Sequence, residues 1–496
     1  MDKKKKMRIM VQGTMSDAGK SILVTALCRI LKQDGYDVCP FKSQNMALNS
    51  YITRDGLEMG RAQVAQAEAA GKEPDARMNP ILLKPSSDTG SQLILVGEVK
   101  GNVTPKEYYA KKSELVPHIM DAYESLAEQA DVMVIEGAGS PAEINLSEFD
   151  IVNMGFAKMV QAPVLLAGDI DRGGVFAQLY GTYALMKEDE RALLEGMIIN
   201  KFRGDPDILT PGLSKLEDLT GRPVLGVVPM LDVDIDDEDS LSQRIKKSDA
   251  ERPIDVAVIR LPRIANFTDL APLEHHPALG VRYVRRPGDL GDPDMVVLPG
   301  TKSTIDDLLW MRESGMEDAV KRFAAKGRPV LGVCGGYQML GEELLDPDRI
   351  ESKTGSVKGI GLLPMTTRFT PDKRRTRYRA EVISDLFRGA KIDGYEVHMG
   401  RTEVNGGSFV RLESGEEDGC VNGNVFGTYL HGLFDTGELT ARVADLLLSA
   451  KGMDPGSYTP VDHRKYKEEQ YDRLADGVRE ALDIDKIYEI MEKYAK

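Results

Sequence analysis

Cysteine is scarce in this chain: its 496 residues include only Cys28, Cys39, Cys334 and Cys420. No pair is spaced as CxxC, and the number is far below that of disulfide-rich secreted domains. A basic stretch opens the chain, but the apolar run after it is too short for a signal peptide, so we expect a solvated tail. These features predict reduced thiols and a cytoplasmic location.

Long hydrophobic runs and surplus positive charge are also missing. No apolar run reaches the roughly 18 residues needed to cross a bilayer, so we expect no membrane segment. Lysine and arginine total 64 against 79 aspartates and glutamates, a net charge of −15. Nonspecific nucleic-acid binding needs a basic surplus, so this balance argues against it. The expected partners are small molecules, and the sequence does not indicate an oligomeric state.

Short apolar runs alternate with helical patterns in the first half of the chain. A chain of this length exceeds one ordinary core, so two or three domains are expected. Runs that are apolar throughout are typical of parallel strands buried on both faces. We predict such strands at 8–12, 132–136, 163–167, 196–200 and 224–228, and helices at 20–33 and 109–130. This order predicts an α/β domain with a parallel sheet.

An acidic run, DVDIDDED at 232–239, interrupts that pattern. We interpret it as the end of one domain and a solvated linker. A second α/β series follows, with strands predicted at 254–259, 281–284, 295–298, 330–333 and 425–429. The predicted organisation is a first domain at 1–232, an acidic linker at 233–252, a second domain at 253–440 and a helical tail at 441–496.

The first predicted strand runs into GTMSDAGKS at 13–21, and a helical pattern follows. In a phosphate-binding loop of this kind, backbone N–H groups hold phosphate oxygens, the lysine neutralises the β- and γ-phosphates, and the hydroxyl coordinates Mg²⁺. The usual spacing has four residues between the glycines, whereas this loop has five, and counting from the threonine restores the fit. We predict an ATP site formed by Gly13, Thr14, Gly19, Lys20 and Ser21.

Acidic and amide side chains follow other predicted strands. Ligands in open α/β sheets bind at the carboxyl ends of strands, so Glu136 is predicted to hold Mg²⁺ together with Ser21. Asp169 and Asp171 end another strand, where binding metal or substrate and simply forming the turn are both open. Asn200 ends a further strand and is predicted to contact the nucleotide, because an amide can donate to and accept from a base edge.

The sequence VLGVCGGYQML at 330–340 places one cysteine after an apolar run and before two glycines. Glycine-flanked turns after a strand present an exposed nucleophile and let a substrate carbonyl approach closely. We therefore predict that Cys334 is a nucleophile rather than an inert core cysteine. Backbone N–H groups of Gly335 and of Gly300, in the turn LPGT, are predicted to stabilise the oxyanion.

A thiol nucleophile needs a base to form its thiolate. Among six histidines, His431 is the best candidate, because it ends an apolar strand and precedes a glycine. His398 is the second choice. His275 and His276 lie in a polar, proline-flanked loop, and we expect them to be solvated. A thiol site and a nucleotide site in one chain suggest two coupled half-reactions.

Taken together, these motifs resemble the cobyric acid synthase family, the glutamine-dependent amidotransferases of cobalamin biosynthesis. The resemblance covers essentially the whole chain, and FKSQNMALNS at 41–50 is its most specific segment. The other segments that carry it are 12–21, 169–176, 200–205, 298–303 and the turns around Cys334 and His431. The resemblance implies a dethiobiotin-synthetase-like P-loop ATPase domain followed by a flavodoxin-like class I glutamine amidotransferase domain.

It also implies a division of the chemistry. Cys334 would attack the side-chain amide of glutamine, forming a thioester and releasing ammonia, with His431 as base and acid. ATP would phosphorylate a carboxylate of the corrinoid adenosylcobyrinic acid a,c-diamide, and ammonia would displace the phosphate. In this family the cycle runs at the b, d, e and g carboxylates.

Two positions depart from related patterns. Many class I amidotransferases carry a glutamate two residues after the histidine, where this chain has Leu433. We therefore predict a Cys334–His431 dyad, with the orienting group for the histidine open. The related a,c-diamide synthase has an aspartate in the segment matching 41–49, where this chain has Gln44 and Asn45, so the second metal ligand is also open.

Three other classes share part of this pattern. The segment at 41–50 argues against the cobyrinic acid a,c-diamide synthase and against a cell-wall lipid amidase pair, which also splits its halves between two chains. A partitioning ATPase would share the unusual phosphate loop. It would not explain Cys334, His431 or a second α/β domain.

Overall fold

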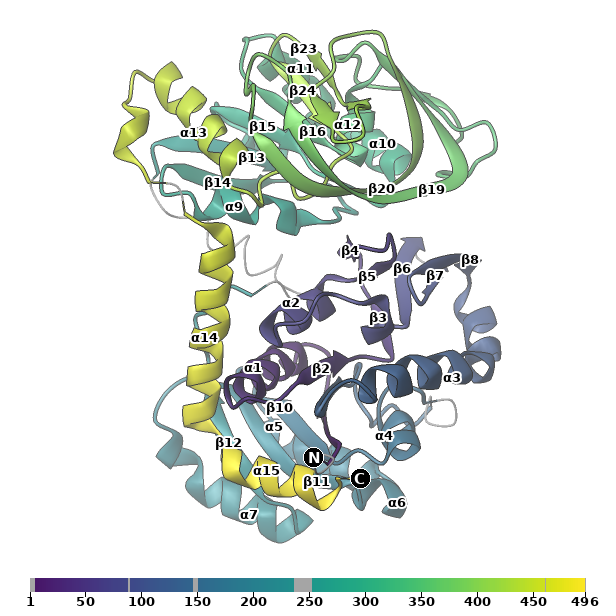
Figure 1. Cartoon of the computed structure of the whole chain (residues 1–496), viewed down its shortest axis with the longest axis vertical. Helices are drawn as coiled ribbons and strands as arrows, with labels where there is room; N and C mark the ends of the chain where they lie inside the picture. The colour runs from purple at the N-terminus through teal and green to yellow at the C-terminus, as the bar shows by residue number, and fades with distance from the viewer. Residues whose placement is uncertain (1–4, 88–89, 146–149, 236–251, 460, 496) are drawn as a thin grey trace. The chain divides into compact units, whose positions relative to one another are not determined.

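The computed structural model describes residues 5–87, 90–145, 150–235, 252–459 and 461–495. The chain divides into two compact units, and neither is continuous in sequence (Figure 1). Unit 1 comprises Met1–Ala47, Leu57–Asp239 and Lys467–Lys496, and unit 2 comprises Leu48–Gly56 and Ser240–Tyr466. The expected acidic linker at 233–252 falls mostly outside the described residues. None of the described helices is both long and apolar enough to span a membrane.

Unit 1 is built on a six-stranded sheet in the order β12-β11-β10-β1-β9-β2, with every neighbouring pair parallel. Its strands are β1 (Met7–Gly13), β2 (Val38–Phe41), β9 (Val132–Glu136), β10 (Val164–Asp169), β11 (Leu194–Phe202) and β12 (Val224–Pro229). The predicted parallel α/β architecture is confirmed. The sequence analysis missed β2, and this omission matters for the site below.

Helices cover this sheet. They are α1 (Lys20–Gln33), α2 (Arg61–Ala69), α3 (Pro105–Ala127), α4 (Met154–Val160), α5 (Val175–Leu185), α6 (Glu188–Arg191) and α7 (Thr210–Thr220). The bounds of α1 match the prediction. Helix α3 begins four residues before the predicted 109, because Thr104 and Glu107 form a capping box and Pro105 occupies the first position.

A second, mainly antiparallel sheet in unit 1 has the order β3-β6-β7-β8. Its strands are β3 (Gln44–Met46), β6 (Ile81–Ser87), β7 (Gly90–Leu95) and β8 (Glu98–Val103). The short strand β5 (Glu58–Gly60) also lies in this unit. The sequence analysis did not predict these strands, which are short and in part exposed.

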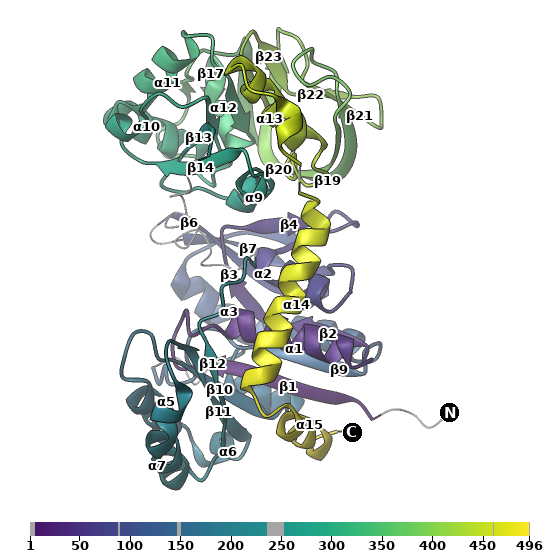
Figure 2. The same cartoon turned by 90° about the vertical axis from the view of Figure 1, so that its left-hand side faces the viewer.

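The C-terminal region is shared between the two units. Helix α13 (Glu438–Ala450) packs in unit 2, whereas most of α14 (His463–Ala481) and all of α15 (Ile484–Lys493) belong to unit 1 (Figures 1 and 2). Leu474 and Ile487 are buried in the same core as Leu27 of α1. The tail expected at 441–496 is therefore not a separate segment. Helical periodicity reveals an apolar face but not the core that buries it.

Unit 2 contains a second six-stranded sheet, in the order β14-β13-β15-β16-β24-β23, parallel except for β23. Its strands are β13 (Ile254–Ile259), β14 (Leu279–Val284), β15 (Met295–Leu298), β16 (Val330–Val333), β23 (Cys420–Asn422) and β24 (Val425–Thr428). Val256 faces the core that contains α13, and Ala257 faces the core that contains α10 (Thr304–Ser314) and α11 (Met316–Ala324). Figure 2 shows these helices on opposite sides of the sheet.

Two long antiparallel strands, β19 (Met365–Val382) and β20 (Lys391–Val404), form a curved ribbon in unit 2 (Figure 1). The remaining elements of the unit are short. They include β4 (Ser50–Ile52), the 3-10 helix η4 (Phe267–Leu270), α9 (Ala271–His275), α12 (Gly335–Leu340), β17 (Glu343–Leu345), β18 (Val357–Lys358), β21 (Val410–Leu412) and β22 (Glu417–Asp418). The β19–β20 ribbon and the η4 turn both supply residues to the thiol site.

Candidate functional site

The phosphate loop connects the end of β1 at Gly13 to the start of α1 at Lys20. The N–H of Thr14 donates to the carbonyl of Ala167 on β10, at 2.9 Å, and so anchors the loop to the sheet. The chain is left-handed at Gly19, with φ 87°. The predicted strand, loop and helix are therefore assembled at the carboxyl edge of the parallel sheet, where ligands bind in such folds.

Asn200 lies directly against this loop. Its Nδ2 donates to the carbonyl of Ala18 at 3.0 Å, and a Cβ at Gly19 would lie 2.1 Å from the same nitrogen. Only glycine fits there, for reasons of space as well as of backbone angle. The structure places Asn200 against the phosphate loop, where its side-chain N–H group supports the loop backbone, and its contact with the nucleotide stays a prediction.

Lys20 is held by backbone carbonyls. Its Nζ donates to the carbonyl oxygens of Met15, at 2.9 Å, and Gly139, at 3.2 Å. These acceptors are neutral, and ionised phosphate oxygens form stronger hydrogen bonds with an ammonium group. The buried lysine can therefore exchange these partners for phosphate.

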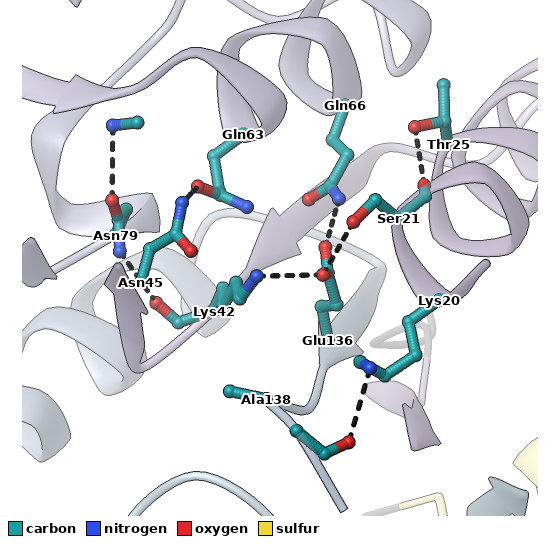
Figure 3. Close-up of polar contacts among 12 residues, drawn as sticks. Lys20, Ser21, Thr25, Lys42, Asn45, Gln63, Gln66, Asn79, Glu136 and Ala138 are labelled. Atoms are coloured by element: carbon teal, nitrogen blue, oxygen red, sulfur yellow. Dashed lines mark hydrogen bonds and ion pairs between the residues drawn. The ribbon is translucent and has the colours of Figure 1, made fainter. Parts of the chain in front are cut away.

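Glu136 is the centre of a buried polar cluster (Figure 3). Its carboxylate accepts hydrogen bonds from Ser21 Oγ at 2.8 Å, from Lys42 Nζ at 2.9 Å and from Gln66 Nε2. Burial alone would raise the pKa of Glu136, but the Lys42 ammonium, with the Gln66 and Ser21 hydrogen bonds, holds it below its usual range. The carboxylate is therefore ionised at neutral pH.

Ser21 and Glu136 fit the predicted magnesium site, since both offer oxygen ligands beside the phosphate loop. Mg²⁺ commonly uses one or two protein oxygens together with substrate phosphates and water. The described residues contain no cluster of three or more histidine, cysteine or acidic side chains placed to hold a metal ion. Gln44 and Asn45 are amides and offer no second carboxylate. Their side chains are engaged elsewhere, since Gln44 accepts a hydrogen bond from Tyr108 and Asn45 donates to Gln63 at 2.9 Å.

Lys42 joins the candidate site, and the sequence analysis missed it. It follows β2, which pairs with β9, and this pairing brings the ends of the two strands together. Lys42 and Glu136 are 5% and 1% exposed and form a buried ion pair. Recognising β2 as a strand would have placed the lysine at the site.

Asp169 and Asp171 are paired with cations at the end of β11 and directly after it. Asp169 Oδ2 lies 3.0 Å from Lys201 Nζ, and Asp171 Oδ1 lies 3.0 Å from Arg203 Nε. Asp169 also accepts the N–H of Asp171 at 2.8 Å. Of the two interpretations left open, these contacts favour a structural turn.

Cys334 lies in a strained turn between β16 and α12, with φ 50° and ψ −109°. Such a conformation costs a non-glycine residue about 1–3 kcal/mol and recurs at active sites. The N–H of Cys334 donates to the carbonyl of Thr428 at 2.9 Å, and a Cβ at Gly336 would lie 2.0 Å from the carbonyl oxygen of Leu298. The turn is thus locked against the neighbouring strands.

The expectation of an exposed thiol is wrong. Cys334 is 7% exposed, and its Sγ lies 3.8 Å from the carbonyl oxygen of Val397 on β20. The strand ribbon covers the nucleophile, and the sequence analysis did not predict that ribbon.

His431 lies beside Cys334 and is oriented by Asp269. His431 Nδ1 is 2.6 Å from Asp269 Oδ2, and Asp269 Oδ1 accepts the N–H of Gly432 at 3.1 Å. His431 and Asp269 are 2% and 7% exposed. Nδ1 is committed to the carboxylate, and the neighbouring Cys334 also helps to raise the pKa of His431. Asp269 thus adds an acid to the predicted dyad, in the orienting position of a Cys–His–Asp triad.

The sequence analysis missed Asp269, which is 162 residues from His431 along the chain. It lies in the turn after β13, and the parallel sheet brings that turn to the same edge as His431. Leu433, where a triad glutamate was sought, is fully buried among apolar side chains. Position 433 therefore serves the core, and a different loop supplies the acid.

Burial lowers the pKa of His431, but Asp269 and Cys334 outweigh this effect and raise it to about 10. The imidazole is therefore protonated at neutral pH. A thiol beside a protonated histidine is a typical activated nucleophile, and the imidazolium can give its proton to a leaving amine.

The two predicted oxyanion residues are both brought to the thiol. A Cβ at Gly300 would lie 3.1 Å from His431 Cε1 and 3.9 Å from Cys334 Cβ. Gly335 begins α12 directly after the nucleophile, where the first N–H groups of a helix have no partner within it. The Gly300 turn, after β15, and the first residue of α12, after β16, thus both lie beside Cys334.

His398 has structural contacts. His398 Nε2 lies 3.1 Å from Glu396 Oε2, and its Nδ1 lies 2.8 Å from the carbonyl oxygen of Gly400. Both ring nitrogens are thus engaged. The expectation of a solvated His276 is wrong, because it is 3% exposed and burial lowers its pKa. His275 is half-buried.

Family models match both halves of the chain. The model described as "CobQ/CobB/MinD/ParA nucleotide binding domain" matches residues 9–241, and that described as "CobB/CobQ-like glutamine amidotransferase domain" matches residues 255–439. A solved structure described as a glutamine amidotransferase matches 40% of this chain and 99% of its own, at 18% identity and a TM-score of 0.30, too weak a likeness to bear on function. Fold, sites and family models together define a glutamine-dependent amidotransferase with a nucleotide-binding domain.

Curated relatives narrow this class. The chain is 57% identical to a cobyric acid synthase of Ruminiclostridium cellulolyticum, over 98% of this chain and 97% of the relative. It is 54% identical to the cobyric acid synthase of Lachnoclostridium phytofermentans, over 98% and 99% of the two chains, and 50% identical to that of Salmonella heidelberg, over 98% of each. The chain belongs to the cobyric acid synthase family, which confirms the resemblance seen in the sequence.

Proposed function

We propose that unit 2 releases ammonia from glutamine at Cys334 and that unit 1 uses ATP to activate corrinoid carboxylates for amidation. A carboxylate is a poor electrophile, and phosphorylation gives it a good leaving group. Ammonia is mostly protonated at neutral pH, so its release from glutamine supplies the reactive form. The products would be the amides at positions b, d, e and g of adenosylcobyrinic acid a,c-diamide.

In unit 2, Cys334 Sγ would attack the amide carbon of glutamine. The N–H groups of Gly335 and of the Gly300 turn would stabilise the oxyanion. His431 would give its proton to the departing ammonia and then take one from the water that hydrolyses the thioester. Asp269 would hold the imidazole in position and stabilise its positive charge.

In unit 1, the loop from Gly13 to Ser21 would hold ATP, and the ammonium of Lys20 would neutralise its terminal phosphates. Ser21 and Glu136 would hold Mg²⁺, which supplies positive charge where negative charge builds up on the transferred phosphoryl group. Lys42, next to Glu136, would add a further positive charge there. Asn200 would support the loop and contact the nucleotide.

One observation carries this proposal: Cys334 is buried beside His431, which is hydrogen-bonded to Asp269, in a chain that also contains the Lys20 loop. A nucleotide switch of the partitioning type would need only the loop. The thiol site therefore favours a nitrogen-transferring ligase.

Mass spectrometry of the products tests the proposal. The full chain would be incubated with ATP, Mg²⁺, glutamine and adenosylcobyrinic acid a,c-diamide. We expect four successive products, each with one OH replaced by NH₂. Turnover of cobyrinic acid, with no reaction of its a,c-diamide, would support the a,c-diamide synthase alternative instead.

A further inference from the structure

A short segment of the chain, Leu48–Gly56, belongs to unit 2, although the residues before and after it belong to unit 1. Its first residues form a reciprocal pair of hydrogen bonds with Asn266. Asn49 Oδ1 accepts the N–H of Asn266 at 2.8 Å, and Asn266 Oδ1 accepts the N–H of Ser50 at 3.1 Å. All three residues are at most 4% exposed. We call this pair of bonds the asparagine latch.

Tyr395 on β20 closes the latch. Its hydroxyl donates to the carbonyl of Ser50 at 3.0 Å and accepts from Asn266 Nδ2 at 3.3 Å. Ile52 packs in a buried apolar cluster with Tyr395. The segment is therefore held by both hydrogen bonds and apolar packing.

Asn266 lies in a turn that contacts two parts of the thiol site. It has a left-handed backbone, with φ 52°, and the latch holds it there. The residue before it, Ala265, donates its N–H to the carbonyl of Gly300 at 2.9 Å. The carbonyl of Asn266 accepts the N–H of Asp269 at 3.0 Å. One turn therefore positions both a predicted oxyanion residue and the acid that orients His431.

Tyr395 also contacts His431. Their rings stack with centroids 5.3 Å apart and planes 23° apart. The N–H of each donates to the carbonyl of the other, at 3.1 Å from Tyr395 and 2.7 Å from His431. The latch thus reaches the histidine by two routes, through Asp269 and through Tyr395.

We infer that Asn49 is a positioning residue for glutamine hydrolysis, acting through Asn266 on the Gly300 turn and on Asp269. The inference rests on the proposed role of Cys334 and His431. Small displacements of catalytic groups reduce rates strongly, because the reaction needs aligned partners. The thiol site thereby depends on a segment inserted from the part of the sequence that builds unit 1.

Asn49→Ala in the full chain tests this role. Without its bond to Asn49, the Asn266 turn can shift and misalign the catalytic groups, so we expect kcat for glutamine hydrolysis to fall roughly tenfold. We expect KM for glutamine and the melting temperature to change little. Amidation driven by added ammonium should stay within about twofold of the wild-type rate, because unit 1 is intact. A wild-type kcat for glutamine hydrolysis would overturn the inference.

Tyr51→Phe is a matched control on the same segment. Tyr51 bonds to Arg377 and packs against Tyr395, so this variant removes a hydroxyl without touching the asparagine latch. We expect glutamine hydrolysis within about twofold of wild type. An equal loss of glutamine hydrolysis in both variants would show that activity depends on anchoring of the whole segment and not on Asn49. That result would overturn the assignment.

A double-mutant cycle separates the latch from a general loss of packing. If Asn49 acts through Asn266, Asn49→Ala combined with Asn266→Ala should cost no more than the larger single change. Additive losses would show another route and overturn the inference. Cys334→Ala separates a failure of the proposed function from a failure of the inference about Asn49. If glutamine-driven amidation persists in Cys334→Ala, the proposed function is refuted. If Cys334→Ala abolishes it while Asn49→Ala has no effect, only the inference fails.

Discussion

The thiol site of unit 2 and the phosphate loop of unit 1 both place a buried pair of opposite charges at the carboxyl edge of a parallel sheet. In unit 2 the pair is His431 and Asp269, 2.6 Å apart, and in unit 1 it is Lys42 and Glu136, 2.9 Å apart. In the thiol site the histidine and the acid are already in contact, and Cys334 lies beside them. In the phosphate loop, Lys20 is bonded to backbone carbonyls and Glu136 to protein donors.

The difference follows from what each site is proposed to bind. Glutamine brings a neutral amide to the thiol, so the protein itself must supply the charges, in a fixed arrangement. ATP brings its own negative charge, and the buried cations of the loop need temporary partners until phosphate replaces them. Five changes test this comparison.

Cys334→Ala should have the largest effect on the thiol site. We expect glutamine-driven amidation to fall by about 10⁴-fold or more, since no other side chain replaces a lost nucleophile. Amidation with added ammonium should continue at the wild-type rate. Measuring both rates on the same preparation tests the separation of the two sites, and failure of ammonium to rescue a folded variant would contradict it.

Lys20→Ala should affect the other site. Loss of the ammonium that neutralises phosphate charge should lower synthesis by roughly 10³-fold with either nitrogen source. Glutamine hydrolysis at the unaltered thiol would be assayed as the control. Retention of ammonium-driven synthesis would remove the loop from the mechanism.

Asp269→Asn should reduce glutamine hydrolysis by roughly 10²-fold, because the imidazole loses its orienting charge. Asp269 helps to raise the pKa of His431 from 6.5 to about 10, so the neutral amide should lower this pKa. Protonated His431 exists below its pKa, and activity that requires it is lost as pH rises. The alkaline limb of the pH–rate profile should therefore move to lower pH, and an unchanged limb would contradict the role of Asp269.

The same shift affects stability. Because the folded pKa of His431 exceeds its unfolded value of 6.5, its contribution is complete below about pH 6.5 and disappears as pH rises towards 10. Thermal unfolding across this range should show the wild-type advantage over Asp269→Asn narrowing with increasing pH.

Glu136→Gln should weaken the binding of ATP with Mg²⁺ by roughly tenfold, since a neutral amide is a poorer ligand for a hard cation. The binding of ATP in the presence of chelator should change less. Calorimetric titrations with and without Mg²⁺ would measure this difference. Equal losses under both conditions would show that Glu136 mainly serves as the partner of Lys42.

Gly300→Ala should have the smallest effect of the five. The added methyl group would lie 3.1 Å from His431 Cε1 and 3.1 Å from the carbonyl oxygen of Ala265, so the turn must shift by a few tenths of an ångström. We expect glutamine hydrolysis to fall by about three- to tenfold, with ammonium-driven synthesis unchanged. Hydrolysis at the wild-type rate would show that the turn tolerates the shift.

The parts of the two sites that could be predicted are those that lie close together in sequence. The phosphate loop and the Cys334 turn each consist of a strand, a glycine-containing turn and a helix, and α1, β13 and β16 have the bounds that their apolar patterns predict. His431 was found because a glycine follows it at a strand end. The flanking residues alone were sufficient in these cases.

The partners of those residues could not be predicted. Asp269 and Lys42 carry no local signal, because an acid or a lysine after a strand is common on any protein surface. Only the strand order brings Asp269 beside His431 and Lys42 beside Glu136. Burial of the thiol depends in the same way on the β19–β20 ribbon.

The sequence by itself determined the two α/β folds and pointed to the candidate nucleophile, its histidine and the phosphate loop, because backbone geometry and apolar periodicity are encoded in neighbouring residues. The tertiary structure decided which acid orients the histidine and which cation pairs with Glu136. It also placed Asn49 in unit 2 and Leu433 in the core. These contacts join residues that are far apart along the chain, and their energies depend on burial, which exists only once the sheets have formed.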